Sequence, residues 1–306
     1  MTSPLITLFT APKPFTNPHI AMIQRNAIRS WAALGDEVTI LVLGEEEGLA
    51  ENAAALGVKH IREIKKNTSG TPLISSLFRT AREANNSPLL AYVNADILLL
   101  PDFVVQARRV TVLAEKFLLV GQRYDLDVRD ELAFTSGWDE RLRQDCTSRG
   151  RLHKPMGSDY FIYPRACFAQ IPDFAIGRAG WDNWMIYEAR QRGWKTIDAT
   201  ESIQIIHQDH DYSHLPGGQP HYRLPETGEN TRLAGGKRAI FTLLDANYQL
   251  TGQGIRRKKL AGRFLRELEI FPLVRMHSFT LAELMHLILH PRELYARLLA
   301  KLGRKR

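Results

Sequence analysis

The pattern of hydrophobic and polar positions alternates between two periods in the first part of the chain. Short continuous apolar runs, typical of strands buried on both faces, occur at residues 5–10, 37–43, 58–61 and 88–93. Apolar positions at helical spacing fill the segments at residues 20–34, 45–57, 71–85 and 101–115. Strands and helices that alternate at these lengths predict an α/β fold with a mostly parallel central sheet flanked by helices.

The pattern becomes less regular after residue 121. Loops and short strands are expected up to about residue 172, followed by a helix that begins near Trp181 or Asp182 and by two later strands. A turn-rich segment then precedes helical apolar spacing that continues to the end of the chain. We therefore predict a main domain over residues 1–214, a flexible linker or flap over 215–236, and a basic helical C-terminal extension over 237–306.

The run PLLAYVNADILLLP (residues 88–101) places Asn94 and Asp96 inside an otherwise apolar segment. A buried carboxylate left without a partner costs about 3–5 kcal/mol, so we expect this turn to open into a cleft at the carboxyl end of the strand. Thr10 ends another predicted strand at the same edge. Carboxylate and amide oxygens suit Mg²⁺ or Mn²⁺ that also contacts substrate phosphates. The alternative is that Asp96 only caps the following turn.

Two further polar clusters lie downstream. Asp182 stands between Trp181 and Trp184 ahead of an amphipathic segment, where a carboxylate among aromatic walls can act as general base toward a sugar hydroxyl. The alternative is an N-cap aspartate flanked by core tryptophans. Three histidines then follow a predicted strand and are compatible with either a zinc site or a polar loop. They are His207, His210 and His214.

Taken in order, these motifs over roughly residues 4–212 resemble the nucleotide-sugar-dependent glycosyltransferases of the GT-A fold, family-2-like, with a galactosyltransferase-like C-terminal motif. In that family a D-x-D-like motif at a strand end binds a divalent cation with the diphosphate of the donor. Here the motif reads Asn94-Ala95-Asp96 and keeps only the last carboxylate. In the inverting branch, an acidic Gly/Trp-rich segment supplies the base and a later histidine completes the metal shell, as Asp182 and His207 do in order and spacing.

The resemblance implies roles for individual residues. Asp182 is the expected catalytic base, and Mn²⁺ or Mg²⁺ the expected cofactor. The expected metal ligands are Asp96, Asn94 and His207. The residues expected to bind the donor nucleotide sugar are Thr10, Ala11, Arg25, Asn94, Ala95, Asp96, Arg123 and Asp125. Those expected to contact the acceptor or the sugar are Asp159, Tyr160, Trp181 and Trp184.

The implied activity is transfer of a sugar from a UDP- or GDP-sugar to a hydroxyl of a glycan or lipid-linked acceptor, with inversion at the anomeric carbon. Two alternatives stay open. The first is a metal-dependent hydrolase that uses the cluster of His207, His210 and His214. The second is a protein that binds a nucleotide on the same fold without turnover.

Charge is concentrated in the C-terminal part. The chain carries a net charge of +8, and residues 235–306 hold 15 Lys and Arg against 5 Asp and Glu. Basic amphipathic segments are typical of membrane-surface elements, so we expect peripheral contact with an anionic membrane through residues 255–306. The alternative is that these helices pack on the main domain and expose a charged face. Since no recognised nucleic-acid-binding motif occurs, no nucleic-acid partner is expected.

Composition bears on the compartment. Two cysteines are too few for a disulfide framework, and no apolar run approaches the roughly 18 residues of a membrane span. The first residues lack a basic stretch followed by a long apolar core, so no signal peptide is expected. These features favour a cytoplasmic protein that the basic extension places at the inner membrane surface.

Overall fold

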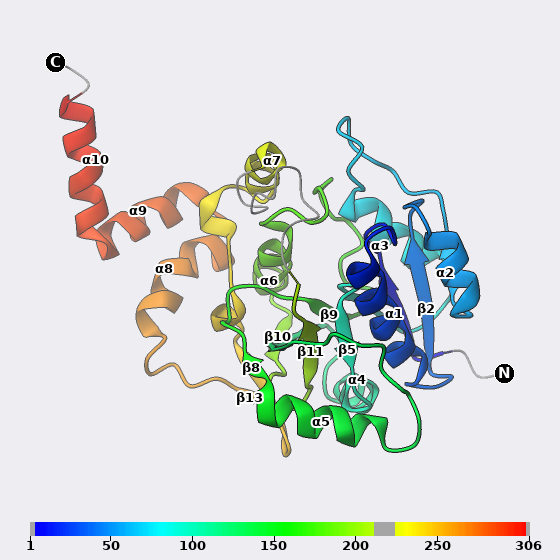
Figure 1. Ribbon diagram of the computed structural model, residues 1–306. Coiled ribbons are helices and arrows are strands. Elements are labelled where there is room, and N and C mark those ends of the chain that lie inside the picture. The colour runs from blue at the N-terminus through cyan, green and yellow to red at the C-terminus, as the bar shows by residue number, and fades with distance from the viewer. Residues whose placement is uncertain (1–3, 211–223, 304–306) are drawn as a thin grey trace.

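The computed structural model describes residues 4–210 and 224–303. Its first part contains the predicted alternation of strands and helices (Figure 1). In chain order the elements are β1 (Ile6–Thr10), α1 (Pro18–Ala32), β2 (Val38–Leu43), α2 (Leu49–Ala55), β3 (Lys59–Ile61), α3 (Ile74–Glu83), β4 (Leu89–Val93), β5 (Ile97–Leu99) and α4 (Asp102–Leu113).

The later part of the chain holds shorter strands and two helices that lie before the histidine cluster. Its elements are β6 (Phe117–Val120), β7 (Arg123–Leu126), α5 (Trp138–Arg149), β8 (Arg151–Leu152), β9 (Tyr160–Pro164), α6 (Trp181–Gln191), β10 (Lys195–Asp198) and β11 (Ile205–Gln208). The predicted helix at Trp181 is confirmed as α6. The sequence did not predict α5, because only Leu142 and Cys146 of this helix are buried and its apolar periodicity is weak.

The main sheet confirms the predicted α/β class. Its strand order is β13-β12-β10-β6-β9-β4-β1-β2-β3, where β12 (Tyr248–Thr251) and β13 (Gly254–Arg257) come from the C-terminal part. Neighbouring strands are parallel except at β9, which runs antiparallel to β4 and β6, and at the β12–β13 hairpin. A second sheet of order β5-β11-β7-β8 lies beyond the end of β4.

Two apolar layers cover the main sheet, as expected for strands without polar alternation. One layer packs α1, α2 and α4 against one face, where Trp31 of α1 is fully buried. The other packs α3 and α6 against the opposite face, around Phe78 and Met185, and α8 (Phe264–Arg275) packs in turn on α6. These layers hold the strands in register and so fix the edge at which β1 and β4 end.

The predicted domain boundaries need correction. Because β12 and β13 extend the main sheet beyond β10, the main domain reaches at least Arg257 rather than residue 214. Within the predicted linker, α7 (Pro225–Leu233) is an ordered helix, and its buried Asn230 exchanges hydrogen bonds with the backbone of Ala175. Apolar spacing alone missed the short hairpin because only Leu250 and Gly254 of its residues are buried.

The C-terminal extension consists of α8, α9 (Phe279–Leu289) and α10 (Pro291–Gly303), which lead away from the sheet (Figure 1). Arg190 of α6 pairs with Glu267 of α8 at 2.8 Å, so the extension begins in direct contact with the main domain. Among the helices that the structure describes, none has the length and hydropathy needed to cross a bilayer.

Candidate active site

Strand register brings distant polar residues to the end of β4. The strand β11 pairs antiparallel with β5, which aligns His207 with Ile97, and parallel with β7, which aligns His207 with Asp125. The turn that carries Asp96 connects β4 to β5, so His207 faces this turn. Gln208 fixes the arrangement, because its backbone N–H and its side-chain amide both donate to the carbonyl oxygen of Asp96 at 3.2 Å.

Asp96, His207 and His210 form one group of possible metal ligands, here called the Asp96 cluster. One donor atom from each lies within 4.8 Å of the others. The Oδ2 atom of Asp96 is 3.1 Å from Nε2 of His210 and 4.0 Å from Nε2 of His207. Its Oδ1 atom is buried and has no hydrogen-bond partner among the described residues. A buried carboxylate oxygen without a partner is costly, which favours a bound cation at this point.

The orientation of His207 also fits a metal ligand. Its Nδ1 atom faces the carboxylate of Asp125 at 3.3 Å, while its Nε2 atom faces Asp96. Histidines that bind metals commonly direct the second ring nitrogen to a carboxylate, which fixes the ring. Asp125 is itself held by Arg123 at 2.9 Å and by His153 at 2.7 Å. Asp125 is therefore placed to orient His207.

Within the cluster, Asp96 and His207 favour each other's charged forms. Although burial alone would raise the pKa of Asp96, the hydrogen bond with His210 and the charges of His207 and Lys13 hold that pKa well below its usual range. Burial lowers the pKa of His207, but the hydrogen bond to Asp125 and the charge of Asp96 raise it. The net effect is an increase in this pKa. The carboxylate of Asp96 is thus ionised over the whole physiological range.

The side chain of Asn94 is held by hydrogen bonds at both ends of its amide. Its Nδ2 atom donates to Oδ1 of Asp159 at 2.9 Å, and its Oδ1 atom accepts from the hydroxyl of Tyr92 at 3.0 Å. Arg123 donates to the same oxygen of Asp159 at 2.7 Å. Both ends of the amide are occupied, which speaks against the predicted role of Asn94 as a metal ligand. Instead, Asn94 connects β4 to the start of β9.

Asp182 lies in the first turn of α6. Gly180 precedes the helix with φ of 109°, a conformation that favours glycine, and its N–H faces the carboxylate of Asp182 at 3.3 Å. Burial, reinforced by the charge of Asp159 and opposed by backbone N–H groups, raises the pKa of Asp182 to about 6. A carboxylate with such a pKa can accept a proton near neutral pH.

The hydroxyl of Tyr92 lies in the electric field of the acidic residues of the site. The pKa of this buried hydroxyl is raised by burial and then by the charges of Asp96, Asp159 and Asp182. Its ring packs against the indole of Trp181 with centroids 5.0 Å apart. The charges of three aspartates therefore act on one tyrosine hydroxyl near the carboxyl end of β4.

The structure places the residues of the predicted aromatic wall in the core. Trp181 and Trp184 are only 5% and 6% exposed and belong to the core between α6 and the sheet, where Trp184 packs on Phe174. Tyr160 is fully buried against Phe103 on the opposite face of the sheet. Packing requirements, rather than a ligand, account for these rings, and this burial speaks against the predicted sugar contacts.

Of the remaining residues predicted to bind the nucleotide sugar, three lie at the ends of strands and one lies on a helix. Thr10, Ala11 and Ala95 lie at the ends of the adjacent strands β1 and β4, and the buried hydroxyl of Thr10 has no hydrogen-bond partner among the described residues. Arg25 instead pairs with Glu131 at 3.1 Å on the outer side of α1.

The structure also adds residues that the sequence did not single out. Lys13, in the loop after β1, lies 3.8 Å from Oδ2 of Asp96 and 3.2 Å from Nε2 of His210. Its position beyond the end of a parallel strand is the sequence signal that could have identified it. Burial lowers the pKa of Lys13, and Asp96 opposes that shift. His214 lies outside the described residues.

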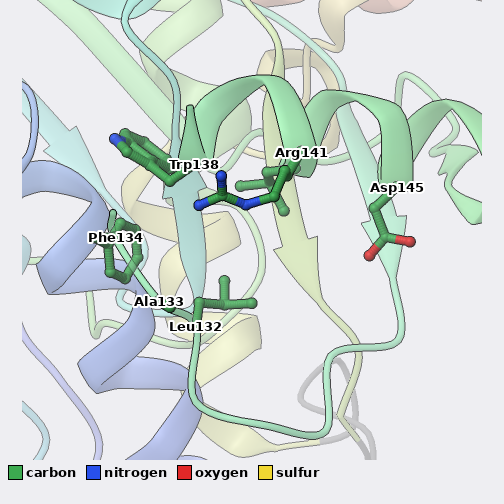
Figure 2. Close-up of a pocket in the computed structure, with 7 residues that line it drawn as sticks. Leu132, Ala133, Phe134, Trp138, Arg141 and Asp145 are labelled. Atoms are coloured by element: carbon green, nitrogen blue, oxygen red, sulfur yellow. The ribbon is translucent and has the colours of Figure 1, made fainter. Parts of the chain in front are cut away.

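A separate pocket of about 300 Å³ lies between the loop after β7 and α5 (Figure 2). Phe134 and Trp138 meet edge to face there, with ring centroids 5.0 Å apart, and Arg141 extends beside them from α5. Unlike Trp181 and Trp184, these rings are only half-buried. The loop that carries Phe134 follows the strand that holds Asp125.

Comparisons with known proteins give structural matches only. No protein-family model matches the sequence, and no curated protein sequence matches it. The mannosyltransferase PcManGT from Pyrobaculum calidifontis, solved with GDP-Man and Mn²⁺, is 13% identical with a TM-score of 0.43, covering 69% of this chain and 59% of that one. The glucosyl-3-phosphoglycerate synthase of M. tuberculosis is 16% identical with a TM-score of 0.43, covering 80% of each chain.

A third match is TarS of S. aureus in complex with UDP-GlcNAc, at 11% identity and a TM-score of 0.45, covering 75% of this chain and 65% of that one. At these identities and scores we base the function on the side chains of the site itself.

Proposed function

We propose that the protein transfers a sugar from a nucleotide-diphosphate sugar to an acceptor hydroxyl, with inversion at the anomeric carbon. The observation that carries this proposal is the contrast between two aspartates around Tyr92. Asp96 is held charged beside two histidines, whereas the pKa of Asp182 is raised to about 6. Neighbouring carboxylates whose pKa values are pushed apart are typical of acid–base sites with divided roles.

The Asp96 cluster would hold a divalent cation through Asp96, His207 and His210. Of the two ions expected, Mn²⁺ accepts nitrogen ligands more readily than Mg²⁺, which prefers an octahedron of oxygens. A cation bound there supplies Lewis-acid stabilisation for the charge on the diphosphate leaving group. Lys13 adds a positive charge on the same side, so the cluster and Lys13 together suit a diphosphate.

Asp182 would act on the acceptor. Its carboxylate takes the proton from an acceptor hydroxyl while that oxygen bonds to the anomeric carbon, and the bond from this carbon to the diphosphate breaks on the opposite face. The nucleoside diphosphate leaves with the electron pair of that bond. Arg123 and Asn94 hold Asp159 in place, and the charge of Asp159 helps to keep the pKa of Asp182 high.

A second candidate is a metal-dependent hydrolase. The observation that favours it is the convergence of two imidazole nitrogens and a carboxylate oxygen, a ligand set also used by catalytic zinc sites. A zinc hydrolase would carry one equivalent of zinc at the Asp96 cluster as purified. A transferase would instead gain stability from a nucleoside diphosphate together with Mn²⁺.

A thermal-shift screen over nucleoside diphosphates and nucleotide sugars, with and without Mn²⁺, tests the proposal. We expect one nucleotide series to raise the melting temperature, and Mn²⁺ to increase that shift because a ligand that binds only the folded state stabilises it. One equivalent of zinc that the wild type carries and Asp96→Ala lacks, together with no response to any nucleotide, would favour the hydrolase and contradict the transferase.

We also propose that the C-terminal extension binds an anionic membrane surface. Most exposed large apolar side chains among the described residues lie between Leu260 and Leu299, including Phe271 on α8 and Leu284 and Ile288 on α9. The exposed side chains of Arg256, Arg257 and Lys259 precede these helices. Apolar side chains combined with an excess of basic residues suit anionic headgroups over an acyl layer.

Vesicle sedimentation tests this surface with substitutions, because truncation at Gly235 would remove two strands of the main sheet. The double variant Leu284→Glu/Ile288→Glu changes two side chains one turn apart on α9. Val112→Glu on α4 is the matched control, since Val112 is 84% exposed outside the extension. On phosphatidylglycerol vesicles we expect at least a tenfold loss of binding for the double variant only. Equal binding of all three proteins, or none by the wild type, would contradict the proposal.

A further inference from the structure

A second group of possible metal ligands lies in the C-terminal extension, far along the chain from the Asp96 cluster. Glu269 of α8, His286 of α9 and His290 at the end of α9 each place one donor atom within 4.8 Å of the others. We call these three residues the tail cluster. The carboxylate oxygen Oε1 of Glu269 is 2.5 Å from Nδ1 of His286 and 3.5 Å from Nε2 of His290.

Both histidines are pre-arranged on one face of α9. They stand four residues apart, so their side chains lie one above the other along the helix. Their ring centroids are 4.2 Å apart with an interplanar angle of 30°. Both rings therefore direct a nitrogen to the same oxygen of Glu269.

The surrounding charges hold the ligands in position. The other ring nitrogen of His286, Nε2, is 2.7 Å from the carboxylate of Glu293 in the first turn of α10. This is the arrangement in which a second carboxylate orients a histidine that binds a metal. Arg266 donates to the other oxygen of Glu269 at 3.1 Å and leaves Oε1 directed at the histidines.

The geometry points to a zinc site formed by Glu269, His286 and His290, with Glu293 as the residue that orients His286. Ligand atoms of one tetrahedral zinc lie about 3.3 Å apart, given metal–ligand distances near 2.0 Å, so small side-chain movements would complete the site. The side chain of His290 is 50% exposed, which leaves a path for the ion and a fourth position open to water. Zinc there would fasten α9 to α8.

The site is tested by zinc stoichiometry in full-length protein. Because the Asp96 cluster is expected to bind metal as well, every protein in the experiment carries Asp96→Ala. The first is otherwise unchanged, the second adds His290→Ala, and the third adds His277→Ala as a matched control. His277 is an exposed histidine at the turn between α8 and α9, outside the tail cluster. Each is equilibrated with Zn²⁺ by dialysis, and bound zinc per chain is measured.

We expect one zinc per chain in the first and third proteins and close to none in the second. Addition of Zn²⁺ should raise the melting temperature of the first and third proteins only. Circular dichroism without zinc checks that His290→Ala leaves the fold intact, as its exposure leads us to expect. Absence of bound zinc from the first protein, or equal zinc in all three, would overturn the inference. Neither result would bear on sugar transfer.

Discussion

Asn94 donates its side-chain N–H to the carboxylate of Asp159 at 2.9 Å, and the backbone N–H of Asn94 donates to the carbonyl of the same residue at 2.9 Å. This pairing explains why an amide stands where the D-x-D-like motif of the glycosyltransferases that the sequence resembles begins with a carboxylate. An amide can donate to Asp159, whereas a carboxylate at this position would repel it.

Asn94→Asp should destabilise the fold in a pH-dependent way. Two carboxylates would face each other, so we expect a loss of about 1–3 kcal/mol in the free energy of unfolding at pH 7. The pKa of the new carboxyl would be raised in the folded state, so the loss should disappear as the pH falls below its unfolded value of about 3.9. Urea unfolding at several pH values measures this.

Asn94→Ala is the control for that experiment, because it removes the same side-chain bonds without adding a charge. Its loss of stability should vary little with pH. If the two variants follow the same pH dependence, charge repulsion at this position is not the reason for the amide.

Asp182→Asn should make the protein more stable while impairing its function. The pKa of Asp182 is raised to about 6 in the folded state, so its contribution to stability is complete below pH 4 and is lost as the pH rises through 6. Removing the charge should therefore raise the free energy of unfolding by about 1–3 kcal/mol at pH 7, with little effect at pH 4. Urea unfolding at pH 4 and pH 7 provides the comparison.

Asp139→Asn is a matched control, since Gly137-Trp138-Asp139 opens α5 as Gly180-Trp181-Asp182 opens α6, and each glycine has a positive φ. Asp139 lies outside the candidate site, so no comparable gain in stability is expected. A gain of equal size for Asp139→Asn would show that the helix position, rather than the environment of Asp182, is responsible.

Gly235→Ala should loosen the contact between α7 and α9. Gly235 follows α7 with φ of 96°, and an added Cβ would lie 2.5 Å from Cζ of Phe279. We expect a loss of about 1–3 kcal/mol from strain and overpacking. In Gly228→Ala, within α7, no atom lies within 4 Å of the added Cβ, so this control should gain up to about 1 kcal/mol. Similar effects of both changes on thermal unfolding would contradict the packing of α9 against this turn.

Asp96→Ala should abolish binding of Mn²⁺ at the Asp96 cluster. Loss of a metal ligand should reduce the affinity for Mn²⁺ at least as much as loss of a residue that only orients a ligand. Loss of such an orienting residue costs on the order of 10–100-fold in metal affinity. Asp125→Asn should reduce the Mn²⁺ affinity less, because Asp125 orients His207 and is not one of the three proposed ligands of the Asp96 cluster. Electron paramagnetic resonance of free Mn²⁺ measures both affinities. An affinity equal to that of the wild type in Asp96→Ala would exclude this cluster as the manganese site.

The alternation of strands and helices up to α4 could be predicted because each element buries a continuous apolar face. The turn at Asp96 was identifiable for the same reason, since polar residues interrupt an apolar strand there. In contrast, the β12–β13 hairpin has few buried residues, and its place at the sheet edge depends on pairing with β10. Pairing between distant strands leaves little trace in local periodicity.

At the candidate site, residue types were easier to predict than contacts. Asp182 was predicted from its place at the start of a helix, but the burial of Trp181 and Trp184 depends on how α6 packs on the sheet. Lys13 and His153 reach the site through loops, whose course the sequence does not encode in a periodic pattern. The role of Asn94 became visible only when β9 was placed antiparallel to β4.

Turnover of nucleotide sugars by the wild type and by Asp182→Asn, with Asp139→Asn as control, tests the central claim most directly. Release of nucleoside diphosphate from UDP- and GDP-sugars would be followed with Mn²⁺ and a panel of hydroxyl acceptors. We expect turnover by the wild type and by Asp139→Asn, and a loss on the order of 10²–10⁴-fold in Asp182→Asn with nucleotide binding retained. Near-normal turnover by Asp182→Asn would contradict its role as the base, and absence of turnover of every donor by the wild type would contradict the proposed transferase.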